Sequence, residues 1–467
     1  MQQPTMRTTH YEPTWDSLQE YAVPEWFKDA KFGIFIHWGV YAVPAFESEW
    51  YPRNMYRTDS PVFNHHRETW GPQSDFGYKD FVPMFRAERW NPDEWVALFK
   101  EAGARYVVPV GEHHDGFAMY DSAQTRWNSA AMGPRRDVAA EMERVVRGAG
   151  MKFGLSSHRA FNWRYYTYAD DFDTVEPQYA DLYSPRHPEE ELTSQEFIVN
   201  WRARTAELID RYHPDLMWFD FGWHADEFAS HRPEVAVYYY NQGIDRGQEV
   251  VLNYKDGFPR GAAVLDIERG KLDDIREPYW QTDTSVSYRS WSYIEDDEFK
   301  SVTTLVHDLV DIVSKNGNLL LNVGPRADGT IPDEVQELLR GVGAWLSVNG
   351  EAIYGSRPWE RFGEGPTGTA VGHLTERQNA PLTPQDIRFT TAGDALYAIC
   401  PGPASGEVLI TSSGSGSSVS EGGIAHISLL GSSDELVWSQ DDAGLHIQWQ
   451  GEPPSEHAVV YKITLSS

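Results

Sequence analysis

The sequence contains little of what several classes of protein require. It has one cysteine, Cys400, among 467 residues, which excludes an intrachain disulfide and a zinc site built on cysteines. No apolar run approaches the roughly 18–20 residues that cross a membrane. Basic residues are scarce, 40 against 70 acidic ones. Nucleic acids and anionic membranes both bind basic surfaces, so neither partner is expected.

Signals for secretion are also missing. Residues 1–15 lack the charged and apolar regions of a signal peptide, and no Asn-X-Ser/Thr acceptor sequence occurs. These absences predict a cytoplasmic bacterial protein, or a secreted one if a leader was trimmed from this chain. The length is typical of two or three domains. A homo-oligomer remains a possible assembly.

Aromatic residues, in contrast, are abundant. The chain has 18 Trp, 24 Tyr and 21 Phe, together 13% of its residues. One interpretation is a well-filled core. The other is a carbohydrate site, because flat apolar faces beside acidic groups suit sugar rings.

Residues 1–355 show apolar runs that alternate with helical patterns. Such alternation is typical of a parallel sheet with helices on its outside. The predicted helices lie at about 92–102, 136–148, 194–212, 298–315 and 333–348, and the stretches 44–85 and 160–192 are predicted as loops. The eight predicted strands are 32–39, 105–114, 152–158, 216–223, 249–254, 264–270, 279–285 and 319–325. The pattern predicts a catalytic (β/α)8-like, TIM-type barrel, incomplete where the gaps between the fifth, sixth and seventh strands are too short for helices.

Residues 356–467 show a different pattern of short alternating strands separated by Gly, Ser and Pro. The predicted strands are 386–400, 406–411, 424–430, 435–439, 445–450 and 458–465, with a flexible hairpin loop at 412–423. This part is predicted to be a separate C-terminal antiparallel β-sandwich domain.

Ionisable residues gather where the predicted barrel strands end. In barrels of this type the catalytic groups sit at the carboxyl ends of the strands, so this distribution predicts an active site there. The residues are His37, His113, His114, His158, Asp220, Lys255, Glu268 and Asp283.

Asp220 is the strongest single candidate. It lies among aromatic residues in LMWFDFGW (216–223), where an isolated carboxylate is costly unless it is paired or used. The alternative is an ordinary exposed aspartate at a strand end. Glycosidic chemistry needs a second carboxylate. The candidates for it are Asp266, Glu268, Asp273, Asp274 and Glu277.

A metal site is not predicted. His113 and His114 are adjacent, and neighbouring side chains on a strand point to opposite faces, so a shared metal would need a bulge or turn. The sequence also lacks the H-E-x-x-H, P-loop and G-x-G-x-x-G motifs, so no cofactor is implied. Neutral imidazoles that bind sugar hydroxyls are the favoured interpretation.

Several segments, taken in order, are similar to one known family. They are WFKDAKFGIFIHWG (26–39), SEWY (48–51), NPDEWVALFKEAGARYVV (91–108), HHDGFAMYDS (113–122), LMWFDFGW (216–223) and NGNLLLNVGPRADGTIP (316–332). With these segments the chain resembles the α-L-fucosidases of glycoside hydrolase family 29.

The resemblance implies an exo-acting, retaining enzyme that removes terminal fucose from oligosaccharides or glycosides through a covalent fucosyl-enzyme. Asp220 matches the nucleophile, and Glu268 is the preferred acid/base, with Glu277 in reserve. His158 stands where the family usually has a tyrosine, and Lys255 where many members have arginine. The residues expected to contact the sugar are His37, Glu49, Trp50, His113, His114, His158, Trp218 and Trp291. The alternatives are an α-L-galactosidase or transfucosidase on the same scaffold, and a carbohydrate-binding protein without catalysis.

Overall fold

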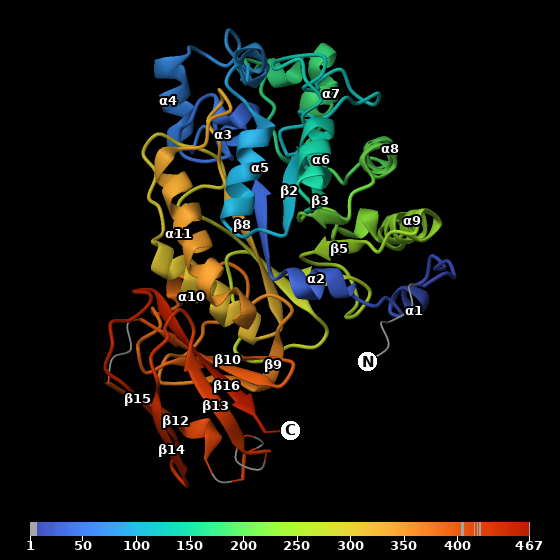
Figure 1. The fold of residues 1–467 in the computed structure, drawn as a ribbon. Helices are drawn as coiled ribbons and strands as arrows, with labels where there is room; N and C mark the ends of the chain where they lie inside the picture. The colour runs from blue at the N-terminus through green and yellow to red at the C-terminus, as the bar shows by residue number, and fades with distance from the viewer. Residues whose placement is uncertain (1–6, 403–405, 415, 418, 420–421, 467) are drawn as a thin grey trace.

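The computed structural model describes residues 7–402, 406–414, 416–417, 419 and 422–466, and its larger part is a closed barrel of eight parallel strands (Figure 1). Strand β8 closes the barrel on β1. Apart from Lys152 and Leu265, every strand residue is buried, which explains the continuous apolar runs. The strands are β1 (Phe32–Ile36), β2 (Tyr106–Glu112), β3 (Lys152–Ser157), β4 (Leu216–Phe219), β5 (Val251–Tyr254), β6 (Val264–Asp266), β7 (Trp280–Ser285) and β8 (Gly317–Val323).

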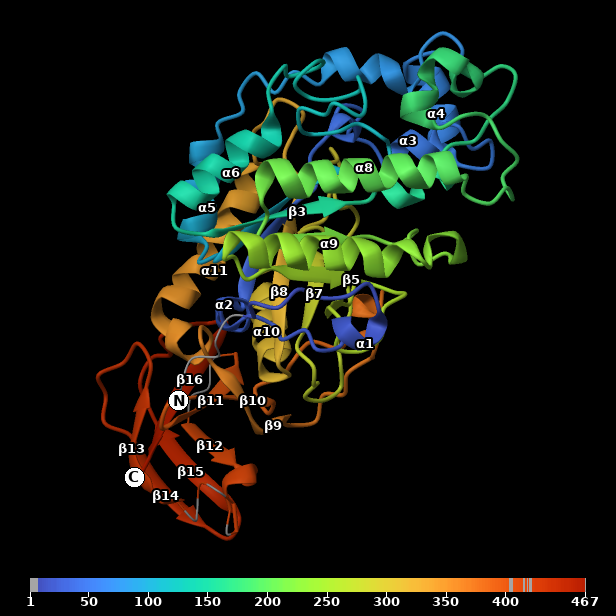
Figure 2. The same ribbon diagram turned by 90° about the vertical axis from the view of Figure 1, so that its right-hand side faces the viewer.

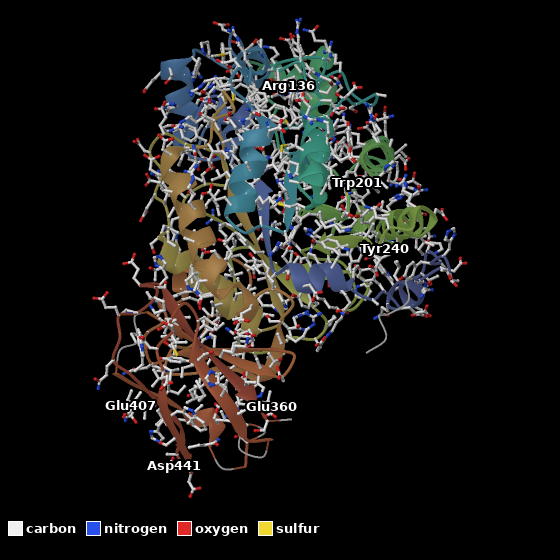
Figure 3. All side chains as sticks on the ribbon, viewed as in Figure 1. Arg136, Trp201, Tyr240, Glu360, Glu407 and Asp441 are labelled. Atoms are coloured by element: carbon white, nitrogen blue, oxygen red, sulfur yellow. The ribbon has the colours of Figure 1, made fainter. Side chains whose placement is uncertain are left out.

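Six helices of ten or more residues surround the barrel. They are α5 (Pro92–Glu101), α6 (Val138–Gly148), α8 (Gln195–Tyr212), α9 (His231–Arg246), α10 (Val302–Ser314) and α11 (Asp333–Asn349). Helices α8 and α9 run side by side over one flank (Figure 2). Figure 3 labels Trp201 on α8 and Tyr240 on α9, and both side chains are almost completely buried. Residues 255–279, all described, hold no helix, so β5–β7 follow one another directly as the short gaps predicted.

Two segments differ from the sequence-based expectation, and a third largely agrees with it. Helix α9 was not predicted, because its HRPEVAVYYYNQGIDR sequence is rich in Val and Tyr, which favour strands. The predicted loop at 44–85 contains α3 (Tyr51–Asn54), α4 (Pro61–Thr69) and the 3₁₀ segment η2 (Tyr78–Met84). The stretch 160–192 is mostly irregular, with short turns of helix at η3 (Arg159–Arg164), η4 (Asp173–Val175), η5 (Pro177–Tyr179) and α7 (Ala180–Tyr183). Two short helices precede β1, namely α1 (Trp15–Leu18) and α2 (Glu25–Ala30).

The barrel interior is a packed core and not a channel. Phe35, Val108, Trp218 and Leu320, from four strands, belong to one buried cluster inside the barrel. The ring of Tyr106 fills the space beside Gly33, so any larger residue at position 33 would collide with it. This filled interior gives the site at the strand ends a rigid floor.

The C-terminal part consists of two antiparallel sheets that enclose a second core, as expected for a β-sandwich. The five-stranded sheet has the order β13-β16-β11-β10-β9, and the three-stranded sheet has the order β12-β15-β14. The predicted strand 386–400 is in fact a hairpin that turns at Gly393 (φ 62°). The strands are β9 (Arg357–Glu364), β10 (Ile387–Ala392), β11 (Ala395–Pro401), β12 (Gly406–Ile410), β13 (Ile424–Leu429), β14 (Val437–Asp441), β15 (Gly444–Trp449) and β16 (Ala458–Leu465).

The sandwich and the barrel share buried side chains. Tyr397 and Val460 of the five-stranded sheet belong to the same core cluster as the helices around the barrel, and Trp345 of α11 donates its indole N–H to Ala458 O at 2.9 Å. In the predicted loop 412–423, the 3₁₀ turn η9 (Thr411–Ser413) precedes positions 415, 418 and 420–421, which lie outside the described residues. Among the helices of the described residues, none is both long and apolar enough to cross a membrane.

Candidate active site

The candidate site lies at the carboxyl end of the barrel, where five strands each end in an ionisable residue. His37, His113, His158, Asp220 and Lys255 are the first residues after β1, β2, β3, β4 and β5. Several of these residues continue the backbone pairing of their strand. The Asp220 N–H donates to Ser157 O at 3.2 Å, and the His158 N–H donates to Glu112 O at 2.9 Å. The strand ladder thus fixes the backbone from which each functional side chain starts.

Asp220 lies at the centre of this cluster. Its Oδ2 is 3.0 Å from His114 Nε2 and 2.9 Å from His158 Nδ1, and its Oδ1 is 2.7 Å from Lys255 Nζ. Burial by itself raises the pKa of this carboxyl, but Lys255 and the two histidines outweigh burial and hold the pKa well below its ordinary value. Asp220 is therefore an ionised, nearly buried carboxylate with a side-chain exposure of 7%.

Lys255 joins Asp220 to a second carboxylate. Its Nζ is also 2.7 Å from Glu268 Oε2, and the Glu268 side chain is 20% exposed. The two bridged oxygens therefore cannot lie further apart than about 5.4 Å, twice the 2.7 Å of each ion pair. This upper limit is compatible with a retaining glycosidase, whose carboxyl groups are about 5–5.5 Å apart, and it is shorter than the 6.5–9.5 Å typical of an inverting one.

The other candidates for the second carboxylate occupy different places. Glu277 precedes β7 and accepts from Asn316 Nδ2 at 3.1 Å, so it lies at the opposite, amino end of the barrel. Asp273 and Asp274 are exposed in the loop before it. Asp266 is buried in β6 and accepts from Gln281 Nε2 at 2.5 Å. Of the five candidates, Glu268 is the one that shares a cation with Asp220.

Asp266 also interacts with Asp283 of β7. Burial and the neighbouring Asp266 carboxylate raise the pKa of Asp283 well above its ordinary value, since two adjacent buried carboxylates cannot both ionise. The pair lies between the neighbouring strands β6 and β7, and Lys255 lowers the pKa of both carboxyls.

The two adjacent histidines lie on the same side of the chain, against the alternation argument. They follow the end of β2, whose pairing with β3 is irregular between Val110 and Glu112, and the chain turns there. Their ring centroids are 4.6 Å apart. The turn that a shared site needs is therefore present.

Two groups of side chains in the site have the composition of a metal site. They are His37 with His113 and His158, and His114 with His158 and Asp220, with ligand atoms within 4.8 Å of one another in each group. The hydrogen bonds of His37 and His158 favour sugar binding over metal binding. His37 Nδ1 donates to Asn322 Oδ1 at 2.7 Å, and both nitrogens of His158 bond to Asp220 and Ser156. These bonds orient the imidazoles and hold their tautomers, which suits hydrogen bonding to hydroxyls.

The imidazoles of three histidines are neutral near pH 7. Burial lowers the pKa of His37 and His113 well below the ordinary value, and lowers that of His158 to about 4. His113 Nδ1 is buried without a hydrogen-bond partner. A buried polar atom of this kind is costly unless a ligand completes it, so His113 points to a bound polar group.

Glu49 and three partly buried aromatic side chains surround the mouth of the site. Glu49 accepts from the Trp291 N–H at 2.9 Å, and burial raises its pKa. The ring of Trp291 lies 5.1 Å from that of His37, and Trp50 lies 5.5 Å from His114 and 6.2 Å from Phe221. Trp218 is only 1% exposed and forms part of the floor together with Phe35.

The structure thus gathers all ten predicted site residues in one place. The sequence did not predict several of the contacts that orient these residues. Asn322, which orients His37, lies inside β8 and had no signal beyond the NVGP segment. The shared position of Lys255 between two carboxylates could not be read from its place after β5.

A closed parallel barrel that presents two carboxylates at this spacing, among aromatic rings and neutral histidines, defines a glycoside hydrolase of the (β/α)8 class. The model of the alpha-L-fucosidase family matches residues 1–351, and the chain belongs to this family. Among curated proteins, the tissue alpha-L-fucosidase of Rattus norvegicus is 33% identical over 98% of this chain and 92% of its own length.

Solved structures agree with this assignment. The alpha-fucosidase of Thermotoga maritima in complex with fucose is 32% identical, with a TM-score of 0.77 over 97% of this chain and 100% of that one. The same protein in complex with a mechanism-based inhibitor is 32% identical and has a TM-score of 0.79 over the same shares of the two chains. The resemblance noted from the sequence is confirmed, as is the predicted barrel followed by antiparallel sheets.

Proposed function

We propose that this protein is an exo-acting, retaining α-L-fucosidase that removes terminal α-L-fucosyl residues from glycans or glycosides. The observation that carries the proposal is the pair Asp220 and Glu268, bridged by one lysine so that the two bound oxygens lie no more than about 5.4 Å apart, within reach of the retaining geometry. The family membership supports the substrate class, and the fucose complex of the Thermotoga maritima relative supports the sugar.

In the first step Asp220 acts as the nucleophile. A carboxylate oxygen attacks the anomeric carbon, the bond from that carbon to the leaving oxygen breaks, and Glu268 gives its proton to that oxygen. The low pKa of Asp220 keeps it ionised for this attack. The product is a β-linked fucosyl ester of Asp220, and the negative charge is now on Glu268, which also faces Lys255.

In the second step Glu268 acts as the base. It takes a proton from a water molecule, the water oxygen attacks the anomeric carbon, and the ester bond to Asp220 breaks. Two inversions give net retention, so the first-formed product is α-L-fucose. Glu268 is more exposed than Asp220, which suits the residue that meets both the leaving group and the incoming water.

Neutral histidines and Glu49 supply the groups that bind the sugar hydroxyls. His37 offers Nε2, because its Nδ1 is held by Asn322, and the unpartnered His113 Nδ1 is a second free position. Trp50, Phe221 and Trp291 supply apolar faces around them. An apolar wall distinguishes a methyl group from a hydroxymethyl group by only about 1–3 kcal/mol, so slow turnover of α-L-galactosides is also expected.

The test uses the purified protein on 4-nitrophenyl α-L-fucoside and α-L-galactoside, with the anomer of the first product followed by proton NMR. A faster fucoside reaction that releases the α anomer is expected. Faster galactoside turnover would instead favour the α-L-galactosidase alternative, and fucosyl transfer to added sugars without hydrolysis would favour the transfucosidase. Binding of fucose without turnover of either substrate would identify a carbohydrate-binding protein and contradict the proposal.

Azide distinguishes the two carboxylates. In Asp220→Gly, azide replaces the nucleophile and inverts the configuration once, which gives the β-azide. In Glu268→Ala, azide attacks the ester of Asp220, and the two inversions give the α-azide. The reverse outcome, or no rescue of either variant on an activated substrate, would show that the roles are wrongly assigned.

A further inference from the structure

A segment of the C-terminal part lies on the loop that carries Glu268. This segment, here called the strap, comprises residues 371–376, which follow β9 and precede β10. The Gly372 N–H donates to Lys271 O at 3.0 Å, and the Glu376 N–H donates to Arg269 O at 2.8 Å. The backbones meet so closely that a side chain at Gly270 would collide with Gly372 O.

Both backbone polar groups of Glu268 are held by the strap. The Leu374 N–H donates to Glu268 O at 2.8 Å, and the Glu268 N–H donates to His373 Nδ1 at 3.1 Å. The residues on either side pair with β7 instead, since Ile267 N and Arg269 N donate to β7 carbonyls. The barrel therefore fixes the neighbours of Glu268, and the strap fixes Glu268 itself.

A buried ion cluster anchors the end of the strap. The Glu376 carboxylate contacts Lys300 Nζ, accepts from Thr284 Oγ1 at 3.0 Å and lies 3.4 Å from Arg269 Nη1. Lys300 is 2% exposed. A carboxylate held by two cations in a nearly dry environment gives the strap a fixed attachment to β7 and the loop after it.

The strap also presents apolar side chains to solvent. Leu374 is 63% exposed and Val371 is 48% exposed. Leu374 has a φ of 58°, a left-handed conformation that costs a leucine about 1–2 kcal/mol. Strain of this kind persists where surrounding contacts impose it and concentrates at functional sites. Leu374 lies between the backbone hydrogen bonds of Gly372 and Glu376, and its own N–H donates to Glu268 O.

We propose that the strap forms the subsite for the leaving group, with Leu374 as its apolar surface and His373 as the positioning residue of Glu268. This inference rests on the proposed function, in which Glu268 protonates the leaving oxygen. The fucosyl ring must lie against Asp220, so the group on the other side of the glycosidic oxygen extends past Glu268, where the strap lies. The chemistry fits a leaving group with an apolar face, such as a pyranose ring or an aryl group.

The subsite is tested with Leu374→Ser on three ligands: a fucosylated disaccharide, α-L-fucosyl fluoride and free L-fucose. Loss of one apolar contact predicts a five- to tenfold decrease in kcat/KM on the disaccharide, mostly through KM. Fluoride fills no subsite beyond the fucosyl ring, so its kcat/KM should not change, nor should the inhibition constant of free fucose.

The matched control is Val437→Ser, which removes an equally exposed apolar residue (68%) on β14, at the end of the molecule far from the barrel (Figures 1 and 2). It should leave all three values unchanged. If Leu374→Ser matched the wild type on the disaccharide, or lost activity equally on the fluoride, the subsite would be refuted. A wild-type protein inactive even on the fluoride would instead contradict the proposed function.

The positioning role of His373 is tested by leaving-group dependence. In His373→Ala, kcat/KM on a series of aryl fucosides should decrease more steeply as the leaving group becomes more basic, with a decrease of about tenfold for the poorest, because acid assistance weakens. His373→Asn should restore the wild-type slope, since Asn Oδ1 can accept the Glu268 N–H as Nδ1 does. An unchanged slope in the alanine variant, or equal loss for all leaving groups and fluoride, would overturn the role.

Discussion

Two buried clusters of opposite charges in this molecule look alike but serve different purposes. In one, Asp311 of α10 lies 2.8 Å from Lys315 Nζ and 2.7 Å from Arg388 Nε on β10, and none of the three side chains exceeds 2% exposure. This cluster joins a barrel helix to the C-terminal sheet. In the other, Asp220 and Glu268 share Lys255 at the open end of the barrel.

The difference lies in the ratio of charges and in access. Asp311 has two cations in direct contact, and these, together with Lys271, outweigh the effect of burial and lower its pKa below the ordinary value. Lys255 serves two carboxylates, one of which is 20% exposed. A buried carboxylate paired with more than one cation stabilises the contact between α10 and β10, here called the junction. Two carboxyl groups that share one cation at an accessible site suit catalysis, in which one attacks the substrate and the other transfers a proton.

The largest effect is expected from removing the nucleophile. Asp220→Gly should lower kcat on 4-nitrophenyl α-L-fucoside by roughly 10⁴-fold or more, because no other group can form the ester. The far-ultraviolet circular dichroism spectrum should match that of the wild type. A variant that keeps a tenth of the activity would show that Asp220 belongs with Asp311, as a structural carboxylate.

The second effect falls on the junction. Asp311→Asn leaves Arg388 and Lys315 buried without their counter-charge, which should lower the free energy of unfolding by about 3–5 kcal/mol. Urea unfolding followed by tryptophan fluorescence measures this loss, and kcat of the folded enzyme at low temperature should stay within twofold of the wild type. A large loss of kcat without loss of stability would reverse the distinction between the clusters.

The third effect concerns the shared cation. Lys255→Met should lower kcat/KM by about 10²-fold, which is the usual cost of removing one charge-stabilising group from a site. Without Lys255 the pKa of Asp220 rises, so the acidic limb of the pH profile of kcat/KM should move to higher pH.

Lys255→Arg is the control for the shared cation, since it keeps the charge and should lose less than tenfold. Equal losses in both variants would mean that shape, and not charge, matters at this position.

The smallest effect is the pH dependence of the junction. Because the pKa of Asp311 is lower in the folded state, its contribution to stability is present above the unfolded pKa of about 3.9 and is lost as the pH falls below it. The stability difference between the wild type and Asp311→Asn should therefore be constant from pH 7 to 5 and shrink below pH 4. Urea midpoints at several pH values measure it, and a difference that grew on acidification would contradict this sign.

The sequence predicted the barrel well, because buried parallel strands leave continuous apolar runs such as FGIFI and LLLNV. It predicted which residues follow the strands for the same reason. It did not predict the turn after Glu112 that places His113 and His114 on one side, since β alternation is a rule for regular strands only. Helix α9 was missed because burial against the barrel overrides the strand propensity of its tyrosines.

Contacts between distant segments were also beyond the sequence. Nothing in the run from Val371 to Glu376 indicates that it meets the loop of Glu268, about a hundred residues earlier. Similarly, the pairing of Asp266 with Asp283, and of Asn322 with His37, depends on which strands become neighbours in the closed barrel. Such pairs acquire meaning only when the three-dimensional structure is known.

The absence of helices between β5 and β7, over residues 255–279, has a consequence for the evolution of this chain. With no helix to cover this flank, the barrel leaves the place where the leaving group departs to a chain segment that belongs to the sandwich. Recombination that exchanged the C-terminal part between two family members would transfer the strap with it. The leaving-group preference would then change, while the fucose-binding residues of the barrel would not.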